Sequence, residues 1–125
     1  MNPSDISASD QPVFDASVLG AMFGDDSAVI ASVLETFLVS IAENLPTLAA
    51  AAATQNFDSV AALAHKIAGA CRMSGAQALG HTAHSVEAAA KRGDADLVRQ
   101  GMANLHSQWA QLQAVVDKLI RAKQP

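Results

Sequence analysis

Residues 57–74 read FDSVAALAHKIAGACRMS, and this stretch decides how the chain is expected to fold. At about 100° per residue, its larger apolar side chains fall on one side of a helix, as in a helix that packs against others. Gly75 follows directly and predicts the end of the helix, while Asn56 or Asp58 is expected to begin it. The predicted core side of this helix consists of Val60, Leu63, Ile67, Ala70, Cys71 and Ser74.

Two helices are predicted before this stretch. Apolar residues recur at steps of three and four from Ser27 to Thr54, which is the pattern of a long amphipathic helix. Pro46 is expected to kink this helix or to divide it near Asn44, because proline lacks a backbone donor and its ring clashes with the preceding turn. Residues 13–23 are largely apolar and are expected to form a brief helix that covers one end of a bundle.

Two more helices are predicted after Gly75. One covers residues 77–91, and Gly93 suits its C-terminal end. Four substantial helices with short connections predict an all-α fold, namely an antiparallel four-helix bundle with a short extra N-terminal helix. The last helix has a narrow apolar seam of the kind used in bundle packing, formed by Val98, Met102, Leu105, Trp109, Leu112, Val116 and Leu119.

The composition favours one soluble domain. The chain has 125 residues, of which 50% are hydrophobic and 4% aromatic, and we divide it into a flexible N-terminal segment, residues 1–12, and a helical domain, residues 13–123. A net charge of −4 argues against nucleic-acid binding. Neither a secretory leader nor a membrane-spanning stretch is expected. A single cysteine fits a reducing compartment, so a cytoplasmic protein is expected.

His65 lies opposite the predicted core side of its helix and is expected to be exposed. An exposed helical surface usually carries long polar side chains, and a glycine inside a helix costs about 1 kcal/mol relative to alanine. The bare surface here predicts a place where another protein approaches the backbone, although the spacing alone leaves open an ordinary surface histidine. The neighbours within about 60° of His65 are Ala61, Ala62, Ala68, Gly69 and Arg72.

Two other groups of residues could suggest a site, but their sequence patterns are weaker evidence of function. His81, His84 and Glu87 follow at steps of three on one helical face, but helical metal-binding pairs are usually four residues apart. We interpret these residues as a polar face that borders the surface around His65. Cys71 lies on the core side and is expected to be a structural thiol.

Residues 64–75, AHKIAGACRMSG, resemble the phosphorylation-site signature of histidine-containing phosphotransfer (HPt) domains. In that signature the histidine is followed by glycine four and ten residues later and by an apolar residue at fourteen. Gly69, Gly75 and Leu79 stand at these offsets from His65. The resemblance extends over most of the chain, from Val13 to Ile120.

The resemblance implies that His65 accepts a phosphoryl group from an aspartate of a receiver domain and passes it to another receiver. The partners would be response regulators, a hybrid sensor kinase or both, with no nucleic acid and no membrane. It also implies a phosphocarrier without autokinase activity and without a cofactor of its own, because Mg²⁺ comes with the receiver. We expect the protein to be a monomer.

Ala68 departs from the family pattern, since many members carry lysine three residues after the histidine, where it helps to hold the phosphoryl group. Arg72 lies only about 20° from the direction of His65, and a guanidinium suits bidentate phosphate contact. Lys66 is adjacent but lies about 100° around the helix. We therefore expect Arg72, ahead of Lys66, to contact the phosphoryl group, and Gly69 to permit close docking.

Two alternatives remain at this stage. The chain could be a helical adaptor or dimerisation bundle, in which case His65→Gln would be tolerated. It could also be the C-terminal HPt domain of a hybrid sensor histidine kinase, with the same chemistry at His65.

Overall fold

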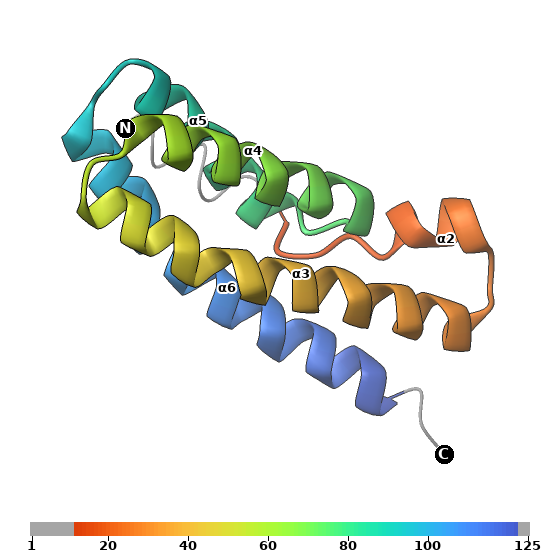
Figure 1. Cartoon of the computed structure of the whole chain (residues 1–125). Coiled ribbons are helices and arrows are strands. Elements are labelled where there is room, and N and C mark those ends of the chain that lie inside the picture. Colours follow the sequence, from red (N-terminus) through yellow and green to blue (C-terminus); the bar gives the residue numbers. More distant parts are fainter. Residues whose placement is uncertain (1–11, 123–125) are drawn as a thin grey trace, which may run out of the picture.

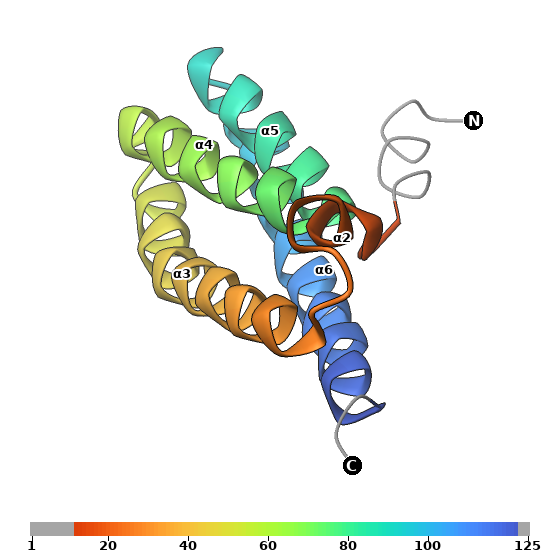
Figure 2. The ribbon, with the colours of Figure 1, turned by 90° about the vertical axis from the view of Figure 1, so that its right-hand side faces the viewer.

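The structure, a computed structural model, describes residues 12–122. The described part is all-α, and its long helices α3 to α6 run antiparallel to their neighbours in a bundle while the short α2 lies across one end (Figures 1 and 2). The predicted all-α bundle with a short N-terminal helix is thereby confirmed. The helices are α2 (Ser17–Phe23), α3 (Ser27–Ala53), α4 (Phe57–Ser74), α5 (Gln77–Lys91) and α6 (Ala95–Ala122).

The ends of α4 are set by local signals that the sequence already shows. The side chain of Asn56 accepts a hydrogen bond from the backbone N–H of Ser59 at 3.4 Å, so Asn56 rather than Asp58 caps the helix. Gly75 ends it in the left-handed conformation, with φ of 91°. The predicted bounds of α4 and α5 are both confirmed.

The N-terminal helix is shorter than expected. Helix α2 begins at Ser17, because residues 13–15 cross the turn between α4 and α5 instead of coiling. The backbone N–H of Asp15 donates to the carbonyl of Gly75 at 2.8 Å, and the carbonyl of Pro12 accepts from Ala78 at 2.9 Å. The proposed flexible segment, residues 1–12, otherwise lies outside the described residues.

Helix α3 continues through Pro46, so the expected division near Asn44 is wrong. Pro46 and Ala42 both lie on the exposed side of the helix, where water can satisfy the carbonyl of Ala42 that loses its intrahelical donor. Leu45 and Leu48 are buried beside Pro46, and this burial favours helix on both sides of it.

Helix α3 is strongly apolar. Among residues 12–122 it is the one helix whose length and composition would suit a membrane span, with a mean hydropathy of 1.6 over an 18-residue window. The expectation that no stretch of the chain spans a membrane stays a prediction. Four of its apolar side chains are buried in the bundle core, and they account for part of this apolar content. They are Leu34, Ile41, Leu45 and Leu48.

The core side of α4 is turned toward α5. Ala64 and Ala68 are buried, whereas Leu63 and Ala70 are only half-buried, which corrects part of the predicted core side. The cause is the close approach of α5: a Cβ added at Gly80 would lie 2.8 Å from the Cβ of Cys71. Small side chains therefore fill the contact between α4 and α5.

Candidate functional site

His65 is exposed near the middle of α4, as predicted, with 75% of its side chain accessible. The neighbouring residues Ala64 and Ile67 are buried and fix the helix against the rest of the bundle. His65 does not lie opposite the core, however. Because the buried side of α4 includes Ala68, His65 lies at the edge of the contact between α4 and α5.

This position brings His65 against Glu87 of α5. The Nδ1 atom of His65 lies 3.2 Å from each carboxylate oxygen of Glu87. Glu87 is only 7% exposed, and its carboxylate also lies 3.0 Å from the Nζ atom of Lys91 and 3.9 Å from Nδ1 of His84. The carboxylate is thus a buried acceptor shared by cationic and imidazole groups.

The pKa of Glu87 reflects two opposing effects. Burial raises it, but hydrogen bonds from Lys91 and His65, together with their positive charge, more than offset this, so that the pKa lies below its ordinary value. Glu87 is therefore ionised at neutral pH. An ionised carboxylate can only accept, so Nδ1 of His65 carries the proton and the lone pair of the neutral ring lies on Nε2.

The surface around His65 is bare, but less of it is accessible than predicted. Ala62 is exposed, while Ala61 and Gly69 are half-buried. Ala68 is only 4% exposed because it packs toward α5, so its place in the predicted docking surface is wrong. Among residues 12–122, a Cβ added at Gly69 would meet nothing within 4 Å, so packing of this described part does not require a glycine there.

The two candidate phosphoryl contacts, Arg72 and Lys66, are both exposed. Arg72 lines a hollow of about 290 Å³ between α4 and α5 together with His81 and His84. Arg72 is two helical turns from His65 and forms no ion pair with another residue of the described range, so its contact with a phosphoryl group stays a prediction. Within residues 12–122 no cluster of three or more His, Cys, Asp or Glu could hold a metal ion.

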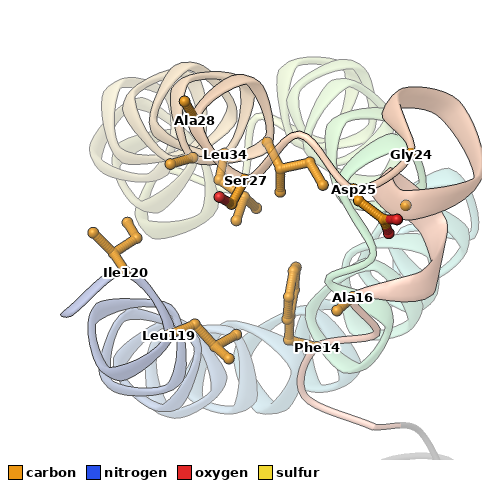
Figure 3. A pocket seen from close by; sticks show the side chains of 12 residues that line it. Phe14, Ala16, Gly24, Asp25, Ser27, Ala28, Leu34, Leu119 and Ile120 are labelled. Carbon is orange, nitrogen blue, oxygen red and sulfur yellow. The ribbon is translucent and has the colours of Figure 1, made fainter. Parts of the chain in front are cut away.

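Two other features lie apart from this site. Cys71 is fully buried, and burial raises its pKa to about 12, which suits a structural thiol and not a nucleophile. A hollow of about 560 Å³ opens between α2, α3 and α6, where Phe14 points inward and Leu34 and Ile120 form parts of its wall (Figure 3). It shares no lining residue with the surface around His65.

The contact of His65 with Glu87, and the ion pair that Lys91 forms with the same carboxylate, were not predicted. Glu87 and Lys91 are four residues apart, which is the spacing of a helical ion pair, and this signal was available in the sequence. It does not show which residue of α4 faces the pair, because that depends on how α4 and α5 are aligned.

Comparison with known proteins identifies the family. The sequence model of the Hpt domain matches residues 32–121, and the chain therefore belongs to the Hpt domain family. Proteins of this family are histidine phosphocarriers of two-component phosphorelays rather than enzymes, and histidine phosphotransfer is the function of this chain. The adaptor alternative is not favoured.

A solved structure supports the fold. Histidine-containing phosphotransfer protein B (HptB) from Pseudomonas aeruginosa PAO1 matches with a TM-score of 0.82 and 20% sequence identity. The match covers 90% of this chain and 98% of that chain. No curated protein matches the sequence.

Proposed function

We propose that His65 is the residue that carries the phosphoryl group, and that Nε2 is the atom that accepts it. The observation that supports this is an exposed imidazole whose Nδ1 faces the buried carboxylate of Glu87. Nε2 attacks the phosphorus of a receiver phosphoaspartate, an N–P bond forms, the P–O bond to aspartate breaks, and the aspartate leaves as a carboxylate. The ring then holds a positive charge, which the nearby carboxylate of Glu87 stabilises.

The partners proposed for this step are receiver domains of response regulators, a hybrid sensor kinase or both. The receiver brings Mg²⁺ and its own acidic pocket, while this chain contributes a nucleophile held in position and needs no cofactor. We further propose that the protein lacks autokinase activity, acts as a monomer in the cytoplasm, and binds neither nucleic acid nor membranes. A place as the C-terminal domain of a hybrid kinase would leave this chemistry unchanged.

The experiment that tests the proposal is phosphotransfer from a panel of phosphorylated receiver domains to the wild type and to His65→Gln. We expect acid-labile, base-stable label on the wild type and none on the variant. His106→Gln is the matched control, because His106 is also exposed but lies on α6, and it should be labelled like the wild type. Label on folded His65→Gln protein, or no label on the wild type from any receiver, would contradict the proposal.

A second prediction concerns Arg72. Replacing it with Ala is expected to shorten the lifetime of the phosphohistidine and to slow transfer by about fivefold, since an exposed cation near a phosphoryl group contributes modestly. The hydrolysis rate of labelled protein measures this directly. Arg121→Ala on α6 is the control and should behave like the wild type, whereas unchanged rates for Arg72→Ala would show that Arg72 does not reach the phosphoryl group.

A further inference from the structure

Charge is unevenly distributed along the chain. Residues 57–92, which form α4, α5 and their flanks, contain four of the eight Lys and Arg residues but only two of the twelve Asp and Glu residues. With neutral histidines, this segment has a net charge of +2 and the rest of the chain −6. Three of the four histidines also lie in the segment. One pair of helices is therefore basic within an acidic protein.

The solvent-facing charge around His65 agrees with this count. The four cations of the segment are exposed, and the buried carboxylate of Glu87 pairs with one of them, Lys91. Asp58, in the first turn of α4, is then its only exposed acid. Helix α3, by contrast, contains Glu35 and Glu43 and no Lys or Arg. The exposed cations are Lys66, Arg72, Lys91 and Arg92.

The hollow beside Arg72 offers a place for a partner's side chain next to this charge. Its lining includes His81 and His84 as well as Arg72, and none of the described residues that line it is acidic. An anionic side chain of a partner that enters this hollow would meet hydrogen-bond donors and positive charge while the partner covers His65. A neutral or basic surface would leave these cations unpaired at the interface, which is unfavourable.

Resting on the proposed function, we infer that the α4–α5 face selects receiver domains whose docking surface is acidic and accelerates their encounter by electrostatic attraction. The acidic remainder of the chain repels such a partner from the other faces, so an approaching receiver is oriented toward His65. The partner is a protein with an acidic surface around its phosphoaspartate, and the effect is on association and not on the transfer step.

The test is the second-order rate of transfer from an acidic receiver, measured at low and high salt for wild type, Arg92→Glu and Lys118→Glu. Arg92 is an exposed cation at the C-terminal end of α5. Lys118 is an exposed lysine in the C-terminal part of α6, which extends away from α4 and α5 (Figure 1). At low salt we expect Arg92→Glu to be about fivefold slower than wild type, with the difference shrinking as salt screens the charges. Lys118→Glu should match the wild type.

Two further readouts separate this inference from the proposed function. At saturating receiver the rate of transfer to Arg92→Glu should equal that of wild type, since only association is affected. Equal second-order rates for the Arg92 and Lys118 variants, or no dependence on salt, would overturn the inference while label on His65 still supported the phosphocarrier role. A loss at saturation as large as the second-order loss would also overturn it, because Arg92 would then act on the transfer step.

Discussion

Gly75→Ala is expected to lower the free energy of unfolding by about 3 kcal/mol. The loss has two causes, because a residue with a side chain is strained in the left-handed conformation and because the added methyl group overpacks the site. The φ angle of Gly75 is 91°, and a Cβ there would lie only 2.3 Å from the backbone carbonyl oxygen of Asp15. Backbone cannot yield as a flexible side chain can, so the segment before α2 must move. Urea denaturation followed by circular dichroism measures the loss.

Gly69→Ala is the matched control, because both glycines belong to the same motif. Gly69 is inside α4, and a Cβ there meets open space, so the variant is expected to be more stable than wild type by up to about 1 kcal/mol. Any slowing of phosphotransfer in Gly69→Ala would then report docking and not folding. Equal losses of stability in the two variants would show that this division of roles between Gly69 and Gly75 is wrong.

Local signals explain which elements could be predicted. Asn56 and Gly75 act within one turn of the ends of α4, so the sequence suffices to locate that helix. Pro46 misled the prediction of a divided helix, because the rule for proline is also local. Whether its missing hydrogen bond breaks a helix depends on water access at Ala42 and on the burial of Leu45, which are properties of the folded bundle.

In the candidate site, too, some features were predicted from one helix and others depend on how the helices pack. The exposure of His65 follows from the periodicity of one helix and was predicted, although His65 lies at the edge of the contact with α5 and not opposite the core. The burial of Ala68 and the contact with Glu87 depend on how closely α5 approaches its neighbours. Two glycines permit this approach: a Cβ at Gly80 would crowd Cys71 at 2.8 Å, and one at Gly101 would crowd Val86 at 2.5 Å. Their roles become visible only once the helices are packed.

Glu87→Gln is expected to slow phosphorylation of His65 by about tenfold, the effect of losing a hydrogen bond to a charged group. Glutamine keeps the shape of the side chain but lacks the negative charge that stabilises the positive charge formed on the ring. Its amide can also donate to Nδ1, and this would place the ring proton on Nε2 and block the nucleophile. The chemical step itself should therefore be slower.

The measurement is labelling by phosphoramidate, a small phosphoryl donor without a docking surface, beside labelling by a phosphorylated receiver. Both rates should fall in Glu87→Gln, whereas Glu43→Gln, an exposed acid on α3, should leave both unchanged. A fall with the receiver alone would assign Glu87 to docking instead of to the ring.

The dependence on pH gives a separate test of Glu87. Its pKa is lowered in the folded protein, so its carboxylate stabilises the fold above the unfolded pKa and loses that contribution only as the pH falls through the lower, folded value. The difference in the free energy of unfolding between wild type and Glu87→Gln should therefore persist from neutral pH down to about pH 5, which is above the ordinary range for glutamate. A difference in stability that vanished between pH 7 and pH 5 would mean that the pKa of Glu87 is not lowered.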